Sequence, residues 1–559
     1  MFARVTRVVA TDAGEFSPVL SPDDKWIVYV SDSGGRSDIF VKFLSGGEAV
    51  NLTAGIRDLY VPRRPGIGGI DISPDGTAIT FGAGEGAGDV PSQQSTYVIG
   101  APLGGTPRKL IERCTGARWS PDGTRLVCVQ AGGSAGDALK VVDANGGNPL
   151  EILPVSGGVH AHWPSWSADG NYVYFNRSVA TDNSEPTEIY RVPAAGGPPE
   201  PVVVTSRRAA FAYPTRDGRG LLYSSNPEGA ELALWWKPFV GEPERVTSGV
   251  GDYAEARLSG DNKMMIATTY QYRRSLATIS ISEGASSQPT SLSEGSSGDY
   301  DPAVSPRGDR MAFSSTRDGN RHIWTARLDG TDARQVTSGM GIDERPAWSP
   351  DGSAIAFVSS RGGVRAIWVV GPDGGGLRKI AGATVIDSLA WSPDGSELVY
   401  AAPAGAAPSL FRVRIDDGRT TRLDIKGGAT APSWSAARNL IAYVASTPSS
   451  SAGPSSASIA FVTPDGRPVA SPWQETPRLA NGAVAWSPDG KLVVGLSDPG
   501  DIESSVWIFD VEGKRAPRKL TDLGNRQSPR GAAWMPDNAR VVIGVTERMS
   551  DIVLFDQGS

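Results

Sequence analysis

The chain has 559 residues, of which 39% are hydrophobic and 21% are charged; this composition is typical of a folded globular protein and argues against a mainly disordered one. Its length exceeds what one hydrophobic core usually serves, so at least two domains are expected. The net charge of −7, from 61 acidic and 54 basic residues, lacks the basic footprint that phosphate backbones select, and we expect no nucleic-acid partner.

The N-terminal segment MFARVTRVVATDAG lacks the apolar core of a signal peptide. No apolar run in the chain approaches the ~20 residues that cross a bilayer, so we expect no direct membrane insertion. These observations leave the compartment open: the chain stays in the cytoplasm, or it is the mature or excised part of a longer protein. From Arg4 the segment is similar to two later stretches, ERVTSG at Glu244 and ARQVTSG at Ala333.

A turn motif, Ser-Pro-Asp-Gly or a variant of it, recurs along the chain at intervals of 43 to 52 residues. This period is too long for short helical solenoids and matches the four-stranded blade of a β-propeller. Proline presets φ, aspartate caps its own backbone and glycine accepts a positive φ, so the motif predicts a tight turn between strands. Its first position falls at Ser21, Ser73, Ser120, Ser167, Thr215, Ser259, Ser305, Ser349, Ser392, Ser435, Ser487 and Met535.

Each repeat predicts four short strands and almost no helix. In the eighth repeat RPAWS is the first strand, SAIAFVSS is a half-buried second strand, and AIWVVG and LRKIAG are the third and fourth. A tryptophan often precedes the turn serine, and we interpret it as packing between neighbouring blades. These tryptophans are Trp119, Trp166, Trp348, Trp391, Trp434, Trp486 and Trp534.

Two cysteines, Cys114 and Cys128, flank one predicted hairpin without falling opposite each other. A single pair cannot form a disulfide framework. We interpret both as free thiols in the core, with a bridge between them as the alternative.

The strands predict an all-β fold of two six-bladed propellers in tandem, twelve blades in total. The twelfth repeat ends with its third strand, DIVLFDQ at Asp551, and the strand from Arg4 supplies a spare fourth strand. A terminus that completes a blade removes a free sheet edge, and one ring of twelve would exceed the usual range of about 4–8 blades. We place the first propeller at residues 1–284, ending with SLATISI, and the second at 285–559, opening with QPTSLSEG, with a Ser/Gly linker at 282–287.

Two repeats carry a family resemblance. DERPAWSPDGSAIAFVSSRGGVRAIWVVGPDGGGLRKI and DYDPAVSPRGDRMAFSSTRDGNRHIWTARLDGTDARQVT resemble the repeats of the TolB-type β-propeller family. Similar repeats are attached to bacterial serine/threonine kinases, winged-helix regulators and peptidases. The resemblance implies a bacterial docking or sensing module, and it alone implies a periplasmic or extracytoplasmic location.

The sequence offers few residues for catalysis. It has three histidines and contains no P-loop, kinase, HExxH, CxxC or GxSxG motif. His160 and His162 alternate in GVHAHWPSW, so both side chains should face the same way. With Glu15 or Glu255 from a neighbouring first strand they could hold a transition metal. This pair is the basis of an alternative function, a metal-dependent propeller hydrolase or lyase, whereas the simpler interpretation is polar residues that bond loop backbones. His322 lies in the second ring.

The segments that enter the first strands should crowd around one mouth of each central tunnel, where ligands usually bind. Acidic residues dominate them, which favours a basic or peptide-like partner. We predict a monomeric scaffold or sensor that is not an enzyme, has no resident metal or cofactor, and binds a protein or peptide at these mouths. The predicted ligand-binding residues are Glu15, His160, His162, Tyr253, Glu255, Asp301, Glu344, Arg345, Asp387 and Arg530.

Overall fold

The computed structural model describes residues 4–556 except 57, 63–68, 86–93, 133–135, 157–158, 179–186, 206–207, 227–231, 248–251, 282–287, 294–297, 364, 383–387, 405–406, 447–456, 474–475, 478, 498–503 and 525–526. All elements in these residues are β-strands, as the repeats predict. Among them there is accordingly no helix with the length and apolarity to span a membrane.

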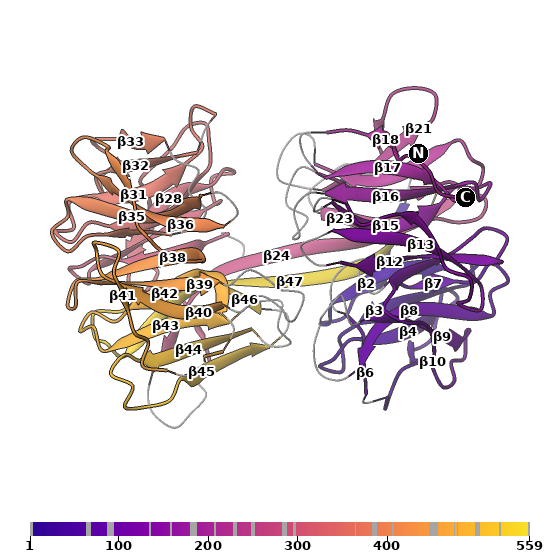
Figure 1. The fold of residues 1–559 in the computed structure, drawn as a ribbon, viewed down its shortest axis with the longest axis horizontal. Coiled ribbons are helices and arrows are strands. Elements are labelled where there is room, and N and C mark those ends of the chain that lie inside the picture. The colour runs from indigo at the N-terminus through magenta and orange to yellow at the C-terminus, as the bar shows by residue number, and fades with distance from the viewer. Residues whose placement is uncertain are drawn as a thin grey trace. The chain divides into compact units, whose positions relative to one another are not determined.

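The strands form antiparallel four-stranded blades that belong to two six-bladed propellers (Figure 1). The chain divides into two compact units, which we call the first propeller (Met1–Gln271 with Arg548–Ser559) and the second propeller (Tyr272–Glu547). The second propeller is one continuous stretch, whereas the first is made from both ends of the chain.

Five blades of the first propeller use consecutive strands, with the first strand of each at the tunnel and β6 (Leu59–Tyr60) as an extra strand beside β8. Their bounds are β2 (Glu15–Leu20), β3 (Trp26–Ser31), β4 (Asp38–Phe43), β5 (Val50–Asn51); β7 (Asp71–Ile72), β8 (Ala78–Glu85), β9 (Ser95–Gly100), β10 (Arg108–Ile111); β11 (Thr115–Trp119), β12 (Arg125–Ala131), β13 (Asp137–Asp143), β14 (Leu150–Leu153); β15 (His160–Trp166), β16 (Tyr172–Ser178), β17 (Glu188–Pro193), β18 (Glu200–Val203); and β19 (Ala209–Pro214), β20 (Gly220–Ser225), β21 (Ala233–Pro238), β22 (Glu244–Arg245).

Five blades of the second propeller are built in the same way. Their bounds are β26 (Tyr300–Val304), β27 (Arg310–Ser315), β28 (His322–Arg327), β29 (Arg334–Gln335); β30 (Asp343–Trp348), β31 (Ile355–Ser359), β32 (Ala366–Val370), β33 (Arg378–Gly382); β34 (Leu389–Trp391), β35 (Glu397–Pro403), β36 (Pro408–Arg414), β37 (Thr420–Arg422); β38 (Gly428–Ser435), β39 (Leu440–Ser446), β40 (Ala457–Val462), β41 (Pro468–Val469); and β42 (Leu479–Trp486), β43 (Leu492–Ser497), β44 (Ser504–Asp510), β45 (Arg518–Gly524).

The sixth blade of each propeller is assembled from two distant parts of the chain. Two 17-residue strands, β24 (Met264–Ser280) and β47 (Arg540–Asp556), each contribute residues to both propellers (Figure 1). In the first propeller, β23 (Asp252–Leu258) pairs with the first half of β24, and β1 (Arg4–Val9) pairs with the second half of β47. In the second, β46 (Gln527–Trp534) pairs with the first half of β47, and β25 (Thr290–Ser291) pairs with the second half of β24.

This exchange corrects the division expected from the sequence. β1 is the fourth strand of the sixth blade of the first propeller, as predicted, but its partner is residues 551–556 rather than the SLATISI segment. That segment lies in the second propeller, so the cut after residue 284 assigns two third strands to the wrong rings. Strand patterns cannot distinguish these pairings, because both third strands have the same alternation. The proposed linker at 282–287 lies outside the described residues.

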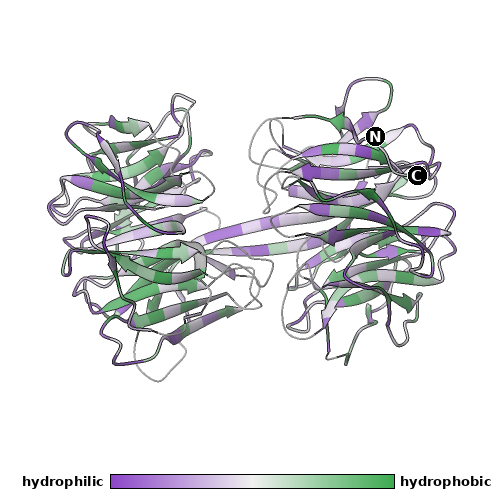
Figure 2. Ribbon diagram, viewed as in Figure 1, coloured by the Kyte–Doolittle hydropathy of each residue, from purple (hydrophilic) through white to green (hydrophobic). Residues whose placement is uncertain are grey.

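Hydrophobic residues are concentrated in the strands of each propeller (Figure 2). Five of the seven recurrent tryptophans donate a hydrogen bond to the neighbouring blade, in line with the predicted packing between blades: the indole of Trp391 donates to the carbonyl of Ala347, and that of Trp348 donates to Ala303, at 2.9 and 3.1 Å. Trp166, Trp486 and Trp534 make the same bond to the preceding first strand. Each such residue therefore supplies both apolar area and one directed bond to the blade interface.

The turn motif is held by its own side chains. In the eighth repeat the Ser349 hydroxyl donates to Asp351 at 2.6 Å and accepts from the backbone N–H of Ala354 at 2.9 Å. Gly352 has φ of 72°, which its lack of a Cβ allows. The hydrogen bond from Ser349, supported by the bonds from Ser353, lowers the pKa of Asp351 to about 2. The aspartate therefore stays ionised and orders the turn.

A feature that the sequence did not predict is a bulge in the first strands, four residues before the turn serine. The ladder register shifts there in both propellers, for example between Ala254 and Arg257 and between Glu344 and Ala347. Such a bulge bends a strand and re-aims its side chains. The residue at this position has a positive φ in ten repeats: Ser17, Gly69, Gly116, Trp163, Phe211, Glu255, Asp301, Arg345, Ala431 and Gly531.

The same bulge overturns the interpretation of the cysteines. Cys114 and Cys128 form a disulfide with a Cα–Cα distance of 5.6 Å. The register of β11 and β12 shifts between Thr115 and Arg118, so the count of opposing residues from a regular ladder fails at this point.

Reduction of this disulfide should destabilise the first propeller by about 3 kcal/mol, since the bridge closes a loop of 14 residues. The measurement is urea unfolding of the wild type with and without reductant. The Cys114→Ala/Cys128→Ala double variant should unfold at the same lower urea concentration in both conditions. Insensitivity of the wild type to reductant would contradict the expectation.

Candidate functional site

The two carboxylates predicted at the mouth of the first propeller are buried within its wall. Glu255 is 2% exposed and accepts hydrogen bonds from the backbone and hydroxyl of Ser17 at 2.9 and 2.8 Å, from Thr268 at 3.1 Å and from Tyr270 at 3.3 Å. Glu15 is fully buried and accepts from Thr11. Glu255 lies in the sixth blade and Ser17 in the first, so this carboxylate joins the two blades that close the ring.

The two histidines do face the same side, but neither predicted glutamate completes the set. The carboxylate is Asp137, whose Oδ2 atom lies 3.1 Å from His160 Nδ1 and 3.7 Å from His162 Nε2. One ligand atom from each of the three residues lies within 4.8 Å of the others. Asp137 begins β13, a third strand, and the sequence analysis considered only first strands. The His/Asp donor set suits a transition metal.

An internal comparison shows that part of this cluster is ordinary blade structure. In the second propeller His322 begins the third strand β28 and lies 3.4 Å from Asp343, which begins the next first strand. His160 and Asp137 make the same contact with the two residue types exchanged. His162 is the additional residue, and its buried Nε2 atom has no hydrogen-bond partner among the described residues. Burial lowers the pKa of His162, against the opposing effect of Asp137.

Tyr253, the remaining predicted residue of the first propeller, packs its ring against Phe555 at 5.9 Å between centroids. The five predicted residues of this propeller thus serve four separate contacts among the described residues.

Four predicted residues of the second propeller come together around Tyr300. Arg530 lies 3.6 Å from Asp301 and 5.9 Å from the centre of the Tyr300 ring. Arg321 and Arg274 lie 4.7 and 5.3 Å from the same ring. These distances are within the range of cation–π contacts.

Glu344 is the buried acidic centre of this group. It is 5% exposed and pairs with Arg321 at 2.7 Å and with Arg365, while Arg345 lies 3.9 Å away. Burial by itself raises the pKa of Glu344, but the surrounding guanidinium groups, Arg345 first, outweigh it and lower that pKa. Glu344 is therefore ionised, and its carboxylate is paired with arginine side chains.

The charge at this mouth is the reverse of the acidic excess expected from the sequence. Four arginines contact the carboxylates of Asp301 and Glu344, and a fifth, Arg274, contacts the Tyr300 ring. The nearby Asp299 and Asp343 are already paired with Arg317 and Arg361. Arg345 and Arg530 lie in first strands, whereas Arg274 lies in the second half of β24, and Arg321 and Arg365 directly precede the third strands β28 and β32. The sequence analysis did not include these last three positions. Asp387, also predicted here, lies outside the described residues.

Asp301 and Arg345 line a cavity of about 350 Å³ that follows the first strands of the second propeller. Its walls are otherwise small or apolar, with Ala303, Ala347 and Ala390 among the lining residues. The mouth group therefore stands at one end of a central tunnel.

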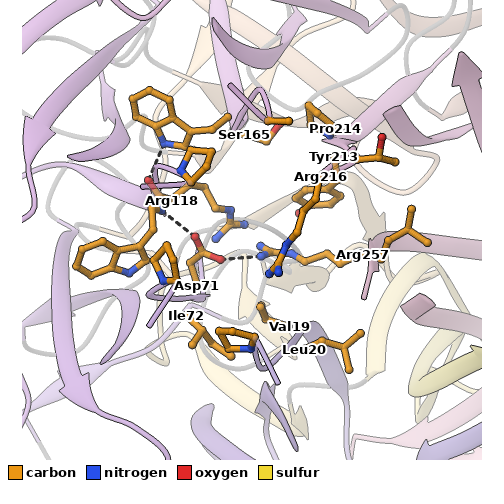
Figure 3. Close-up of a pocket in the computed structure, with 18 of the residues that line it drawn as sticks. Val19, Leu20, Asp71, Ile72, Arg118, Ser165, Tyr213, Pro214, Arg216 and Arg257 are labelled. Atoms are coloured by element: carbon orange, nitrogen blue, oxygen red, sulfur yellow. Dashed lines mark hydrogen bonds and ion pairs between the residues drawn. The ribbon is translucent and has the colours of Figure 1, made fainter. Parts of the chain in front are cut away.

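The first propeller has a larger cavity, of about 550 Å³, at the opposite end of the first strands from Glu15 and His160. It is lined by the ends of these strands and by the turn motifs that follow them. Figure 3 shows the side chains of Arg118 and Arg257 pointing toward Asp71 inside it. The sequence analysis did not predict this site.

The repeats match a known family. A family model for the TolB β-propeller domain matches residues 285–388, and the all-β blades around that match have the corresponding architecture. Residues 285–388 are therefore similar to the TolB β-propeller domain.

Similar proteins with TolB-type propellers include two solved structures. The putative TolB from Agrobacterium tumefaciens is 21% identical and covers 50% of this chain and 99% of that one, with a TM-score of 0.38. TolB from Acinetobacter baumannii is 19% identical and covers 50% and 66%, with a TM-score of 0.36. An uncharacterised protein of Agrobacterium fabrum is 29% identical over 182 residues, which are 31% of this chain and 57% of the relative.

A signal for the missed cavity lies in one position of the TolB-type repeat, two residues before the turn serine. In the second propeller this position holds only alanine or serine: Ala303, Ala347, Ala390, Ser433, Ala485 and Ala533. In the first propeller it holds Val19, Asp71, Arg118, Ser165, Tyr213 and Arg257. An alignment of the twelve repeats would have shown that charge appears here in one ring alone.

Proposed function

We propose that this protein is a non-catalytic recognition module whose second propeller binds an extended peptide segment of a protein partner. The observation that carries the proposal is the convergence of Asp301, Glu344, Arg345 and Arg530 with Tyr300 at the tunnel mouth. Arginine and tyrosine are the residue types enriched where protein partners bind most strongly.

The excess of arginine at this mouth indicates the charge of the peptide that it would bind. Glu344 is neutralised by Arg321 and Arg365, and Asp301 faces Arg530, so the remaining guanidinium groups favour acidic side chains on the peptide. The tunnel beyond, with its alanines and tryptophans, would accept a small apolar residue.

A catalytic role has less support. The His160–Asp137 contact recurs as His322–Asp343, which favours a structural role for this pair in the blade interface. We therefore keep binding as the proposed function and do not assign a hydrolase or lyase activity to His160 and His162.

The test is peptide binding by the whole chain, measured as fluorescence anisotropy with two labelled peptide pools that differ only in Asp/Glu against Lys/Arg content. The acidic pool should bind to the wild type. The Arg530→Ala variant should bind it at least about fivefold more weakly, because it loses one arginine contact at the interface. Arg540→Ala is the matched control, because Arg540 makes an exposed pair with Asp537 in the same blade. Preference for the basic pool, or no binding of either, would refute the proposal.

A further inference from the structure

Two buried arginines, Arg118 and Arg257, lie beside the carboxylate of Asp71 in the cavity of the first propeller, which Asp24 and Arg216 also line. Arg257 donates to Asp71 Oδ1 at 2.7 Å and to the carbonyl of Ile70 at 3.2 Å. The other carboxylate oxygen of Asp71 accepts the backbone N–H of Trp119 at 2.8 Å. The Asp71 carboxylate is thus already bound by one guanidinium and one backbone amide.

Arg118 has no such partner. It is 4% exposed, and its Nη1 atom donates to the Ile70 carbonyl at 2.6 Å. No carboxylate in the described part of the chain forms an ion pair with it, and its buried Nε–H has no hydrogen-bond acceptor there. Burial and the neighbouring Arg257 lower the pKa of Arg118, against the smaller opposing effects of Tyr213, which shares a hydrogen bond with it, and of Asp71. A buried charge without an ion pair of its own is costly, so the site gains stability from an anion that enters.

The fold does not require charge at this position. The second propeller has Ala390 where the first has Arg118, and Ala533 where the first has Arg257, counted from the turn serine of the corresponding blade. Those alanines leave its tunnel apolar and the ring intact. The arginines of the first propeller therefore need an explanation other than blade packing.

The cavity also has the size and walls of a ligand site. Its volume of about 550 Å³ lies within the usual range for small ligands, and Trp119, Trp166 and Tyr213 are among its lining residues. Arg257 lies 4.7 Å from the centre of the Tyr213 ring, and Figure 3 shows both guanidinium groups directed inward. Forked guanidinium donors match the geometry of carboxylate and phosphate oxygens.

We propose that the tunnel of the first propeller binds an oxyanion, a carboxylate or phosphate group, through Arg118 and Arg257. Asp71 holds Arg257 in place, and these three side chains together carry one positive unit of charge. This site lies in the first propeller and goes beyond the peptide-binding function proposed for the second.

The test is isothermal titration calorimetry of the whole chain in chloride buffer at fixed ionic strength, with four probes: inorganic phosphate, succinate, and acetyl-dialanine with a free or an amidated C-terminus. At least one anion should bind, and the amidated peptide should not. Binding of phosphate or succinate assigns the site to a free small anion. Binding of acetyl-dialanine with a free C-terminus, and of no other probe, assigns it to a peptide C-terminus.

Arg118→Ala should weaken binding of that anion about ten- to hundredfold, the loss expected for a charge-assisted contact. This variant reproduces the residue of the second propeller and should fold. Asp71→Asn, which keeps an acceptor for Trp119 and removes the competing charge, should bind at least about threefold more tightly. Equal binding by the wild type and Arg118→Ala, or no binding of any anion, would overturn the proposal. Arg530→Ala should leave anion binding unchanged. Anion binding by the first propeller and peptide binding by the second are therefore tested independently.

Discussion

Deletion of residues 548–559 should unfold the first propeller and leave the second folded. The deletion removes the third strand of the sixth blade and the only described ladder partner of β1. It also removes three buried side chains, Ile552, Val553 and Phe555, which pack in two core clusters. At about 1.5–3 kcal/mol each they contribute about 5–9 kcal/mol, comparable with the whole stability of a domain, about 5–15 kcal/mol. Calorimetry should show that one of two thermal transitions is lost.

Matched fragments test the same exchange of strands. Residues 272–547 contain every strand of the second propeller and should fold alone, whereas residues 1–284 lack the 551–556 strand and should not. A chain in which a short Gly/Ser turn joins residue 271 to residue 548 should restore the first propeller as a separate domain. Deletion of 557–559 alone is the control and should change nothing. A folded, cooperatively melting 1–284 fragment would show that SLATISI can complete the first ring after all.

Glu255→Ala should destabilise the first propeller by about 3–5 kcal/mol. The carboxylate accepts four hydrogen bonds from Ser17, Thr268 and Tyr270, and its loss leaves these buried donors without their acceptor. Because Ser17 and Glu255 lie in the first and sixth blades, the effect falls on ring closure. The measurement is the free energy of unfolding from urea titration of the whole chain.

Two companion variants separate this bond network from charge alone. Glu255→Gln keeps the side-chain shape and one acceptor, so it should lose less than the alanine variant. Glu512→Ala removes an exposed glutamate paired with Lys514 and should cost less than about 1 kcal/mol. A similar small effect of Glu255→Ala would show that the closure bonds contribute little.

The sequence by itself determined the repeat, the blade and the number of blades. Each Ser-Pro-Asp-Gly turn is a local structure, held by bonds within about five residues such as those of Ser349, and so it can be read without the rest of the chain. The alternation of strands and the tryptophan before each turn are local in the same sense. The involvement of β1 in the last blade of the first propeller followed from counting strands alone.

The tertiary structure decided which of several similar strands pair with each other and which side chains come together. SLATISI and DIVLFDQ carry the same alternation, and only the folded chain assigns them to the second and first propellers. A bulge four residues before the turn serine shifts the register, which brings Cys114 to Cys128 in one repeat and buries Glu255 against Ser17 in another. Three of the arginines around Tyr300 and Glu344 lie outside the first strands, so the charge of that mouth could not be summed from first strands alone. Asp71, Arg118 and Arg257 do all lie in first strands, but only the folded ring brings them together. The repeats made the fold predictable from sequence. They could not predict which third strand completes which sixth blade, because similar local patterns leave the choice of strand partner to long-range packing.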